Sequence, residues 1–173
     1  MTKRMSVSII LAAALLAAAM PVAAEQAIFV VRHAERAAPA TAAGAPGMMA
    51  DDPPISPAGE QRAAQLATML ASAGIRHIFV TEYRRTRQTA DPLAKQLGLE
   101  PSVRSSKDPG ATVVDVRAAE GNVLIVGHSN TVPDLLKRLG VTETVTIGDG
   151  DYDNLFVVFR SKAGEATLVR LKF

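Results

Sequence analysis

Short runs of apolar residues alternate along this chain with longer stretches in which apolar residues recur at a helical period. Residues 27–31 (AIFVV), 75–80 (IRHIFV) and 123–126 (VLIV) are short segments rich in Val, Ile and Phe. Such segments are typical of buried β-strands. Two further runs, 155–159 and 166–171, are separated by the turn sequence Ser-Lys-Ala-Gly. This pattern predicts an antiparallel hairpin near the C-terminus.

Three stretches between these runs carry apolar residues on one helical face. Ser56 and Pro57 predict the start of the first helix, because Ser caps a helix N-terminus and Pro suits its first position. Glycines at positions 74, 98 and 140 predict where the three helices end. The apolar stripes are Ala63, Leu66, Ala67, Leu70 and Ala73; Ala90, Leu93, Ala94 and Leu97; and Val132, Leu135, Leu136 and Leu139.

Residues 103–119 fit two interpretations. The valines at positions 113, 114 and 116 favour a strand, whereas the length of the segment and the Gly-Asn turn after it suit a short helix. The remaining order is strand, helix, strand, helix, strand, helix and hairpin. It predicts a single α/β domain with a mostly parallel central sheet flanked by helices and a C-terminal antiparallel hairpin.

The first 24 residues have the organisation of a secretory signal peptide. Lys3 and Arg4 form a positive segment, residues 7–20 are apolar and rich in Ala, and Val-Ala-Ala at 22–24 supplies small residues for cleavage. We therefore expect residues 1–24 to be removed and residues 25–173 to form the domain, in the periplasm or secreted. An uncleaved membrane anchor is the alternative. After cleavage we expect no stable membrane association.

Charge and composition exclude other classes of partner. Of the 19 basic side chains, two precede residue 25, which leaves 17 against 17 acidic ones. A neutral domain in a chain with only 4% aromatic residues gives no support for nucleic-acid binding. The chain has no Cys, so an exported form contains no disulfide. Nothing in the sequence predicts a partner protein.

Polar residues follow three of the predicted strands. Arg32 and His33 follow the first, residues 81–90 (TEYRRTRQTA) follow the second, and Gly127-His128-Ser129 follows the third. The carboxyl ends of parallel strands lie at one edge of a sheet, so these segments are expected to converge there. A guanidinium binds two phosphate oxygens at once, and an imidazole attacks phosphorus or carries a proton. The pattern indicates phosphate chemistry.

These segments together resemble the histidine phosphatase superfamily, which includes phosphoglycerate mutase-like enzymes. Arg32-His33-Ala34-Glu35 resembles the nucleophile motif of that family, and residues 55–60 (ISPAGE) resemble its loop-to-helix element. Residues 84–90 (RRTRQTA) resemble its second arginine motif, and residues 127–129 resemble its second histidine motif. The resemblance covers nearly all of residues 25–173 and implies the phosphoglycerate mutase-like fold.

The resemblance also implies a role for each motif residue. His33 is the expected nucleophile, which becomes phosphohistidine and is then hydrolysed. Arg32 and Arg85 are the expected cations around the transferring phosphoryl group, and His128 is the expected donor to a phosphoryl oxygen. Neither a metal nor another cofactor is required in this scheme. The expected substrate-binding residues are Glu35, Arg36, Ser129 and Asn130.

One part of the family pattern is missing from this chain. Many members place an acid directly after the second histidine, where this chain has Ser129, or in an insertion that is short here. Asp108 is the candidate proton donor, with Asp51 or Asp52 as alternatives from the preceding loop. An alkoxide leaving group needs such a donor, which contributes a factor of roughly 10²–10⁴.

The sequence therefore predicts a metal-independent phosphomonoester hydrolase. Its expected substrate is a small or envelope-linked phosphorylated metabolite, because an exported enzyme meets such molecules. Two alternatives remain at this stage. One is a non-catalytic phosphate- or phosphosugar-binding protein on the same fold, and the other is a phosphohistidine protein phosphatase.

Overall fold

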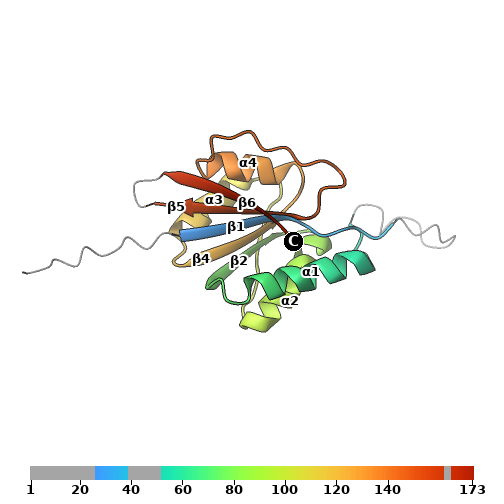
Figure 1. Ribbon diagram of the computed structural model, residues 1–173. Helices are drawn as coiled ribbons and strands as arrows, with labels where there is room; N and C mark the ends of the chain where they lie inside the picture. Colours follow the sequence, from blue (N-terminus) through green and yellow to red (C-terminus); the bar gives the residue numbers. More distant parts are fainter. Residues whose placement is uncertain (1–25, 39–51, 162–164) are drawn as a thin grey trace, which may run out of the picture.

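The computed structural model describes residues 26–38, 52–161 and 165–173 of the chain (Figure 1). All strands lie in one six-stranded sheet with the order β3-β2-β4-β1-β5-β6. The elements are β1 (Gln26–Arg32), α1 (Pro57–Leu70), β2 (Ile75–Thr81), α2 (Arg84–Leu97), β3 (Ser102–Arg104), α3 (Pro109–Ala118), β4 (Asn122–Gly127), α4 (Thr131–Arg138), β5 (Asn154–Arg160) and β6 (Ala166–Lys172).

The sheet is parallel from β3 to β1 and antiparallel at its other end. Strands β1 and β2 both pair in parallel with β4, and β2 also pairs in parallel with β3. Strand β5 runs antiparallel to β1, and β6 runs antiparallel to β5. The expected single α/β domain with a C-terminal hairpin is confirmed. The register between β1 and β4 places Arg32 beside Gly127, so His33 and His128 leave the sheet as neighbours.

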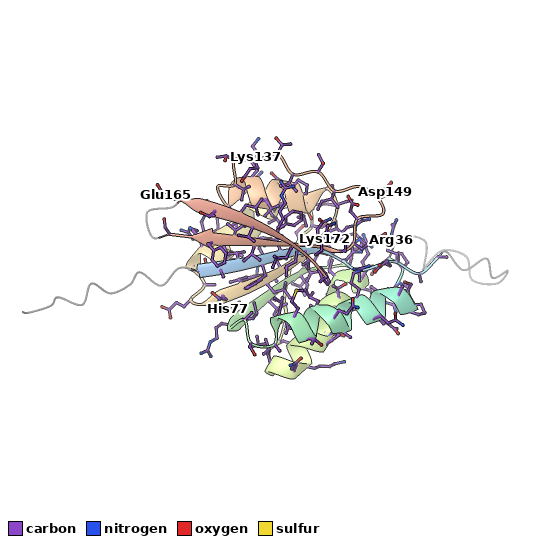
Figure 2. The ribbon with its side chains drawn as sticks, in the orientation of Figure 1. Arg36, His77, Lys137, Asp149, Glu165 and Lys172 are labelled. Carbon is purple, nitrogen blue, oxygen red and sulfur yellow. The ribbon has the colours of Figure 1, made fainter. Side chains whose placement is uncertain are left out.

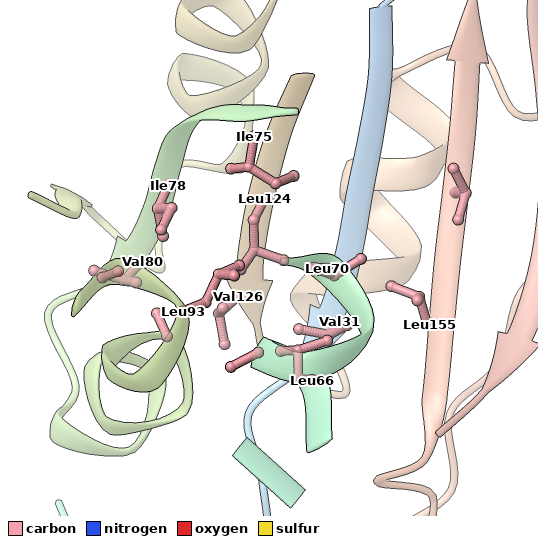
Figure 3. Packing of buried hydrophobic residues seen from close by; sticks show 14 of the residues in the cluster. Val31, Leu66, Leu70, Ile75, Ile78, Val80, Leu93, Leu124, Val126 and Leu155 are labelled. Atoms are coloured by element: carbon pink, nitrogen blue, oxygen red, sulfur yellow. The ribbon is translucent and has the colours of Figure 1, made fainter. Parts of the chain in front are cut away.

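Helices cover both faces of the sheet and bury two apolar clusters (Figure 1). On one face, α1 and α2 pack Leu66, Leu70 and Leu93 against the sheet residues Leu124 and Val126 (Figure 3). On the other face, α3 and α4 cover a second cluster that includes residues of β1, β4 and β5. Leu and Ile side chains buried this completely each contribute about 1.5–3 kcal/mol. The resulting frame holds the strand ends rigidly.

The start of α1 forms as expected, but its end differs. The Ser56 hydroxyl accepts a hydrogen bond from Gly59 N at 3.1 Å, and Pro57 occupies the first turn. The helix ends at Leu70 rather than at Gly74. Gly74 has a φ of +65° and lies in the connection to β2, because a left-handed residue is required in that turn. The glycine therefore marks the turn and not the helix end.

The ambiguous segment 103–119 contains a short edge strand and a helix. Strand β3 adds to β2, and α3 begins after Asp108, whose carboxylate accepts a hydrogen bond from Ala111 N at 2.9 Å. Val113 and Val116 are buried whereas Val114 is 67% exposed, which is the three-residue spacing of a helix face. The valines thus pack as a helix stripe, and the strand interpretation is wrong for them.

Residues 36–37 and 54–55 hold together the two ends of the long loop after β1. Ala37 N donates to Pro54 O at 2.9 Å, and Arg36 forms an isolated antiparallel bridge with Ile55. The expected signal peptide and Asp51 lie outside the described residues. Among the residues described, no helix is both long enough and apolar enough to cross a membrane.

Candidate active site

The carboxyl ends of β1, β2 and β4 open into a cleft of about 600 Å³. The four residues expected to be catalytic, Arg32, His33, Arg85 and His128, all line it. Figure 2 shows Arg36 and Asp149 at this end of the molecule and His77 at the opposite end. The sequence-based expectation that these motifs converge at one sheet edge agrees with this arrangement.

His33 is a buried and neutral imidazole. His33 directly follows β1, and its backbone N donates to Gly127 O at 2.9 Å. Nδ1 lies 2.7 Å from the carbonyl oxygen of Ala34, which accepts only, so Nδ1 carries the proton and Nε2 the lone pair. Burial, together with the charges of Arg32 and Arg85, lowers the pKa of His33 to about 3. The ring is therefore a competent nucleophile at neutral pH.

Arg32 is held by uncharged groups of the loop before β5. Its Nη1 donates to the carbonyl oxygens of Gly148 at 2.8 Å and Asp149 at 3.0 Å. Its Nη2 donates to the Tyr152 hydroxyl at 3.3 Å, and the Tyr152 ring centre lies 4.1 Å from the guanidinium carbon. The residue is 4% exposed, and its Nε has no partner among the described residues. A rigid cation with a free N–H thus faces the cleft.

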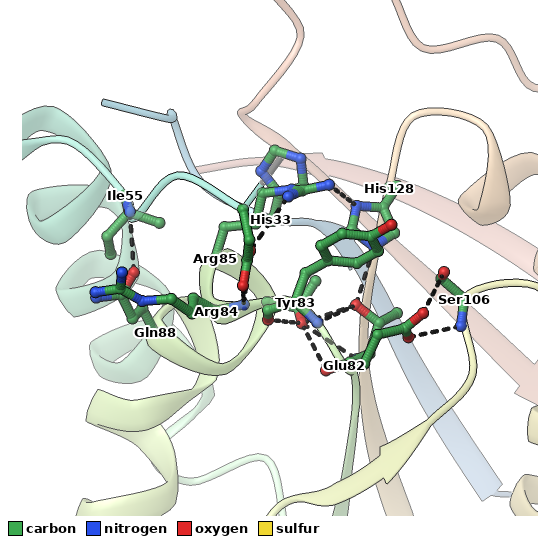
Figure 4. Close-up of polar contacts among 12 residues, drawn as sticks. His33, Ile55, Glu82, Tyr83, Arg84, Arg85, Gln88, Ser106 and His128 are labelled. Atoms are coloured by element: carbon green, nitrogen blue, oxygen red, sulfur yellow. Dashed lines mark hydrogen bonds and ion pairs between the residues drawn. The ribbon is translucent and has the colours of Figure 1, made fainter. Parts of the chain in front are cut away.

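Arg85 projects from the first turn of α2 and is held by a charged group and an aromatic ring. Its Nη1 lies 3.5 Å from the Asp52 carboxylate, and its guanidinium carbon lies 4.2 Å from the Tyr83 ring centre. Its Nη2 donates to His128 Nδ1 at 3.4 Å (Figure 4). Its Nε is buried and has no partner among the described residues. Burial lowers the pKa of Arg85, but a guanidinium keeps its charge in proteins.

His128 is fixed through both of its ring nitrogens. Arg85 only donates, so His128 Nδ1 accepts, and Nε2 carries the proton that it donates to the Thr81 hydroxyl at 2.9 Å. Burial, with a further contribution from Arg85, lowers the pKa of His128 to about 4. His128 is therefore neutral at neutral pH, with its lone pair on the cleft side. The expected donor acts as an acceptor in this resting state.

The turn after β4 requires a glycine before His128. A Cβ on Gly127 would lie 2.9 Å from the Thr131 hydroxyl oxygen, which accepts a hydrogen bond from His128 N at 2.9 Å. The missing side chain at 127 lets the first turn of α4 approach the strand end closely. Gly127 and Thr131 together fix the backbone from which the His128 ring projects.

The residues expected to bind substrate divide into two groups. Arg36, Ser129 and Asn130 line the cleft. Glu35 instead forms an ion pair with Arg62 of α1 at 2.7 Å and is not among the lining residues. Partial burial acts to raise the pKa of Glu35, but hydrogen bonds from Arg62 outweigh it and lower the pKa. Neighbouring side chains on an extended segment point to opposite sides, which explains the different directions of Glu35 and Arg36.

The candidate proton donors lie near the cleft but are occupied in other contacts. Asp108 caps α3, and the residues on either side of it line the cleft while Asp108 itself does not. Both Asp52 oxygens accept from Arg84 N at 3.0 Å, at the start of α2. The acidic residues that do line the cleft are Asp134, which pairs with Arg138, and the exposed Asp149. The assignment of a proton donor stays a prediction.

Several residues of the site were not found from the sequence. Thr81 and Tyr83 come shortly before the second arginine motif, at the end of β2 and directly after it. This position was the only feature of the sequence that pointed to them. Tyr152 lies in a loop far along the chain, and nothing in the sequence linked it to Arg32. No group of three or more His, Cys, Asp or Glu side chains suited to a metal ion occurs within the described ranges.

Comparisons with known proteins agree with this fold. The profile of the histidine phosphatase superfamily (branch 1) matches residues 28–106, and a comparison with curated proteins gives no match. The structure of the protein histidine phosphatase SixA with tungstate aligns with a TM-score of 0.65 and 19% identity, over 85% of this chain and 97% of that one. The mycobacterial glucosyl-3-phosphoglycerate phosphatase aligns with a TM-score of 0.62 and 14% identity, over 86% of this chain and 98% of that one.

The fold and site together define a class of protein. At the carboxyl ends of the parallel strands, a neutral imidazole lies near two guanidinium groups whose Nε atoms are buried, as an enzyme that handles phosphoryl groups requires. The matched residues contain the arginine-histidine pair and the second arginine motif. The chain belongs to the histidine phosphatase superfamily, branch 1, and is a phosphatase of that superfamily.

Proposed function

We propose that this protein hydrolyses phosphomonoesters through a phosphohistidine on Nε2 of His33, without a metal ion. The observation that carries the proposal is the pair of buried arginine Nε atoms, on Arg32 and Arg85, that have no partner among the described residues. Buried polar atoms are normally satisfied. A phosphoryl group between these arginines and next to His33 would supply the missing acceptors.

The reaction consists of two displacements at phosphorus. In the first, the His33 Nε2 lone pair forms a bond to phosphorus while the bond to the ester oxygen breaks, and the alcohol leaves with a proton supplied by the proton donor. In the second, water attacks phosphorus and returns a proton to that donor, the N–P bond breaks, inorganic phosphate is released and the neutral imidazole is restored. Arg32 and Arg85 offset the negative charge on the phosphoryl oxygens in both steps.

The environment of the cleft bears on the substrate. Two acidic side chains line it: Asp134, which is paired with Arg138, and the exposed Asp149. We propose a small or envelope-linked phosphomonoester, because an exported enzyme meets such molecules, and we propose that Arg36, Ser129 and Asn130 hold it around its leaving group. Asp108 is the proposed proton donor, which requires its carboxylate to leave the cap of α3.

The test is turnover of p-nitrophenyl phosphate and a panel of sugar phosphates by the purified protein in the presence of a chelator. His33→Ala is expected to lower kcat by a factor of about 10³ or more. The matched control is His77→Ala, because His77 is exposed at the opposite end of β2 and is expected to retain full activity. Turnover that survives in His33→Ala, or that vanishes with the chelator, would contradict the proposal. Phosphate binding without turnover would instead favour a binding protein.

We also propose that the domain acts outside the cytoplasm. The support is the positive, apolar and small-residue pattern of residues 1–24. The test is the N-terminal residue of the protein recovered from a periplasmic fraction, which is expected to be Glu25. Recovery of the intact chain with the membrane fraction would identify the segment as an anchor, and recovery from the cytoplasm would contradict export.

A further inference from the structure

The hydrogen bonds around His128 have a defined direction. Thr86 is fully buried, and its hydroxyl donates to Tyr83 O at 2.8 Å while its oxygen accepts from Thr81 N at 3.1 Å. The Thr81 hydroxyl lies 3.0 Å from the Thr86 oxygen and donates to it, because the Thr86 proton is already committed. Thr81 therefore accepts from His128 Nε2 at 2.9 Å. This relay holds the imidazole proton on Nε2, away from the cleft.

The other ring nitrogen of His128 then presents a lone pair where phosphoryl oxygens must bind. Nδ1 and Nη2 of Arg85 are 3.4 Å apart, and both side chains line the cleft (Figure 4). A lone pair repels the oxygen of an anion, whereas an N–H at the same position donates a charge-assisted hydrogen bond to it. Occupation of the cleft by a phosphoryl group therefore requires one proton between Nδ1 and the anion.

The charges around His128 oppose this proton in the empty cleft. The titratable and charged groups near it come from β1, the segment before α1, the end of β2 and the start of α2: Arg32, His33, Asp52, Glu82, Tyr83 and Arg85. Burial and the nearby Arg85 outweigh the acidic groups and keep the ring neutral. A bound phosphoryl group adds negative charge and reverses this balance.

We propose that the cleft takes up a phosphoryl group together with one proton, which resides on Nδ1 of His128, so that the site prefers phosphate monoanions to oxyanions without a proton. The inference rests on the proposed function only in placing the phosphoryl group between His33 and His128. A phosphate monoanion brings the proton itself, whereas sulfate must take it from solvent. The cleft thus discriminates between two tetrahedral oxyanions of similar size.

The experiment measures the binding of inorganic phosphate and of sulfate to the purified protein by calorimetry. One linked proton changes affinity tenfold per pH unit. Between about pH 5 and 6, where free phosphate is largely the monoanion, the Kd of sulfate is expected to rise about tenfold and the Kd of phosphate to stay constant. At about pH 8, buffers of different ionisation enthalpy are expected to show one proton taken up per phosphate bound.

Two variants locate the proton. His128→Asn keeps an amide donor near the Nδ1 position but does not titrate, so phosphate is expected to bind it with no proton uptake and with a smaller preference over sulfate at about pH 6. His33→Ala is expected to take up the proton as the unaltered protein does. If His33→Ala loses the uptake and His128→Asn keeps it, the assignment to His128 is wrong.

Other results overturn the inference while leaving the proposed function standing. Phosphate bound without proton uptake at about pH 8 would mean that the Thr81 relay reverses and moves the existing proton from Nε2 to Nδ1. Equal pH dependence for sulfate and phosphate between about pH 5 and 6 would also contradict the proposed selection. Failure of the unaltered protein to bind phosphate at all would contradict the proposed function itself.

Discussion

The two sides of the cleft hold their arginines in contrasting ways. On the β1 side, backbone carbonyl oxygens and a tyrosine hydroxyl hold Arg32, and no carboxylate among the described residues forms an ion pair with it. On the α2 side, Asp52 and His128 hold Arg85. We therefore expect Arg32 to bind an anion independently of pH, whereas the anion affinity of Arg85 is expected to depend on its acidic partner and on a titratable imidazole.

Replacement of each arginine by Lys gives the largest expected difference. A Lys ammonium cannot reproduce the fixed fork that donates to Gly148 O and Asp149 O and still leaves Nε free. Arg32→Lys is expected to lower kcat/KM for p-nitrophenyl phosphate by about 10³, and Arg85→Lys by about 10². Steady-state kinetics measure both. Equal losses of kcat/KM would show that the uncharged hydrogen-bond partners of Arg32 give it no catalytic advantage over Arg85.

Thr81 offers a smaller and more specific test of the α2 side. Thr81→Val keeps the shape but leaves His128 Nε2–H without its acceptor, which costs about 1–3 kcal/mol in a buried site. We expect kcat/KM to fall about tenfold to a hundredfold, and Thr81→Ser to restore most of it. The readout is the pH profile of kcat/KM, whose shape is expected to change in the Val variant only. A profile that keeps its shape in Thr81→Val would contradict a positioning role.

Asp52 gives the smallest expected effect. Its carboxylate is 31% exposed and lies 3.5 Å from Arg85, and such pairs contribute at most about 1 kcal/mol. Asp52→Asn keeps an acceptor for Arg84 N but removes the competing charge, so the inhibition constant of phosphate is expected to fall about threefold. Asp153→Asn is the matched control, since Asp153 pairs with Lys172 outside the cleft lining. Weaker inhibition in Asp52→Asn would show that Asp52 positions Arg85 more than it competes.

Sequence patterns predicted the strands, the helices and the motif residues of this molecule better than the residues that hold the motif side chains in place. Strand runs and glycine ends located most elements, because burial imposes periods of two and 3.6 residues. Residues 103–119 stayed ambiguous because closely spaced valines suit either structure, and only packing against α4 and the sheet decides between them.

The same division holds at the site. Arg32, His33, Arg85 and His128 stand in recognisable strings, and the structure brings them into one cleft. Tyr152 contacts Arg32 from 120 residues away, a proximity that no local pattern encodes. Glu35 is the last residue of the nucleophile motif, yet its carboxylate pairs with Arg62. The direction of this side chain is set by a partner on α1, which the motif itself does not contain.

The proposed function depends above all on transfer of the phosphoryl group to Nε2 of His33. The most direct measurement is rapid quenching of the protein into alkali during turnover of a phosphomonoester, followed by mass spectrometry of its peptides. We expect a phosphoryl group on His33 that is stable in alkali, is lost in acid and is absent from His33→Ala. Product formation with His33 unmodified throughout, or a phosphoryl group on another residue, would contradict it.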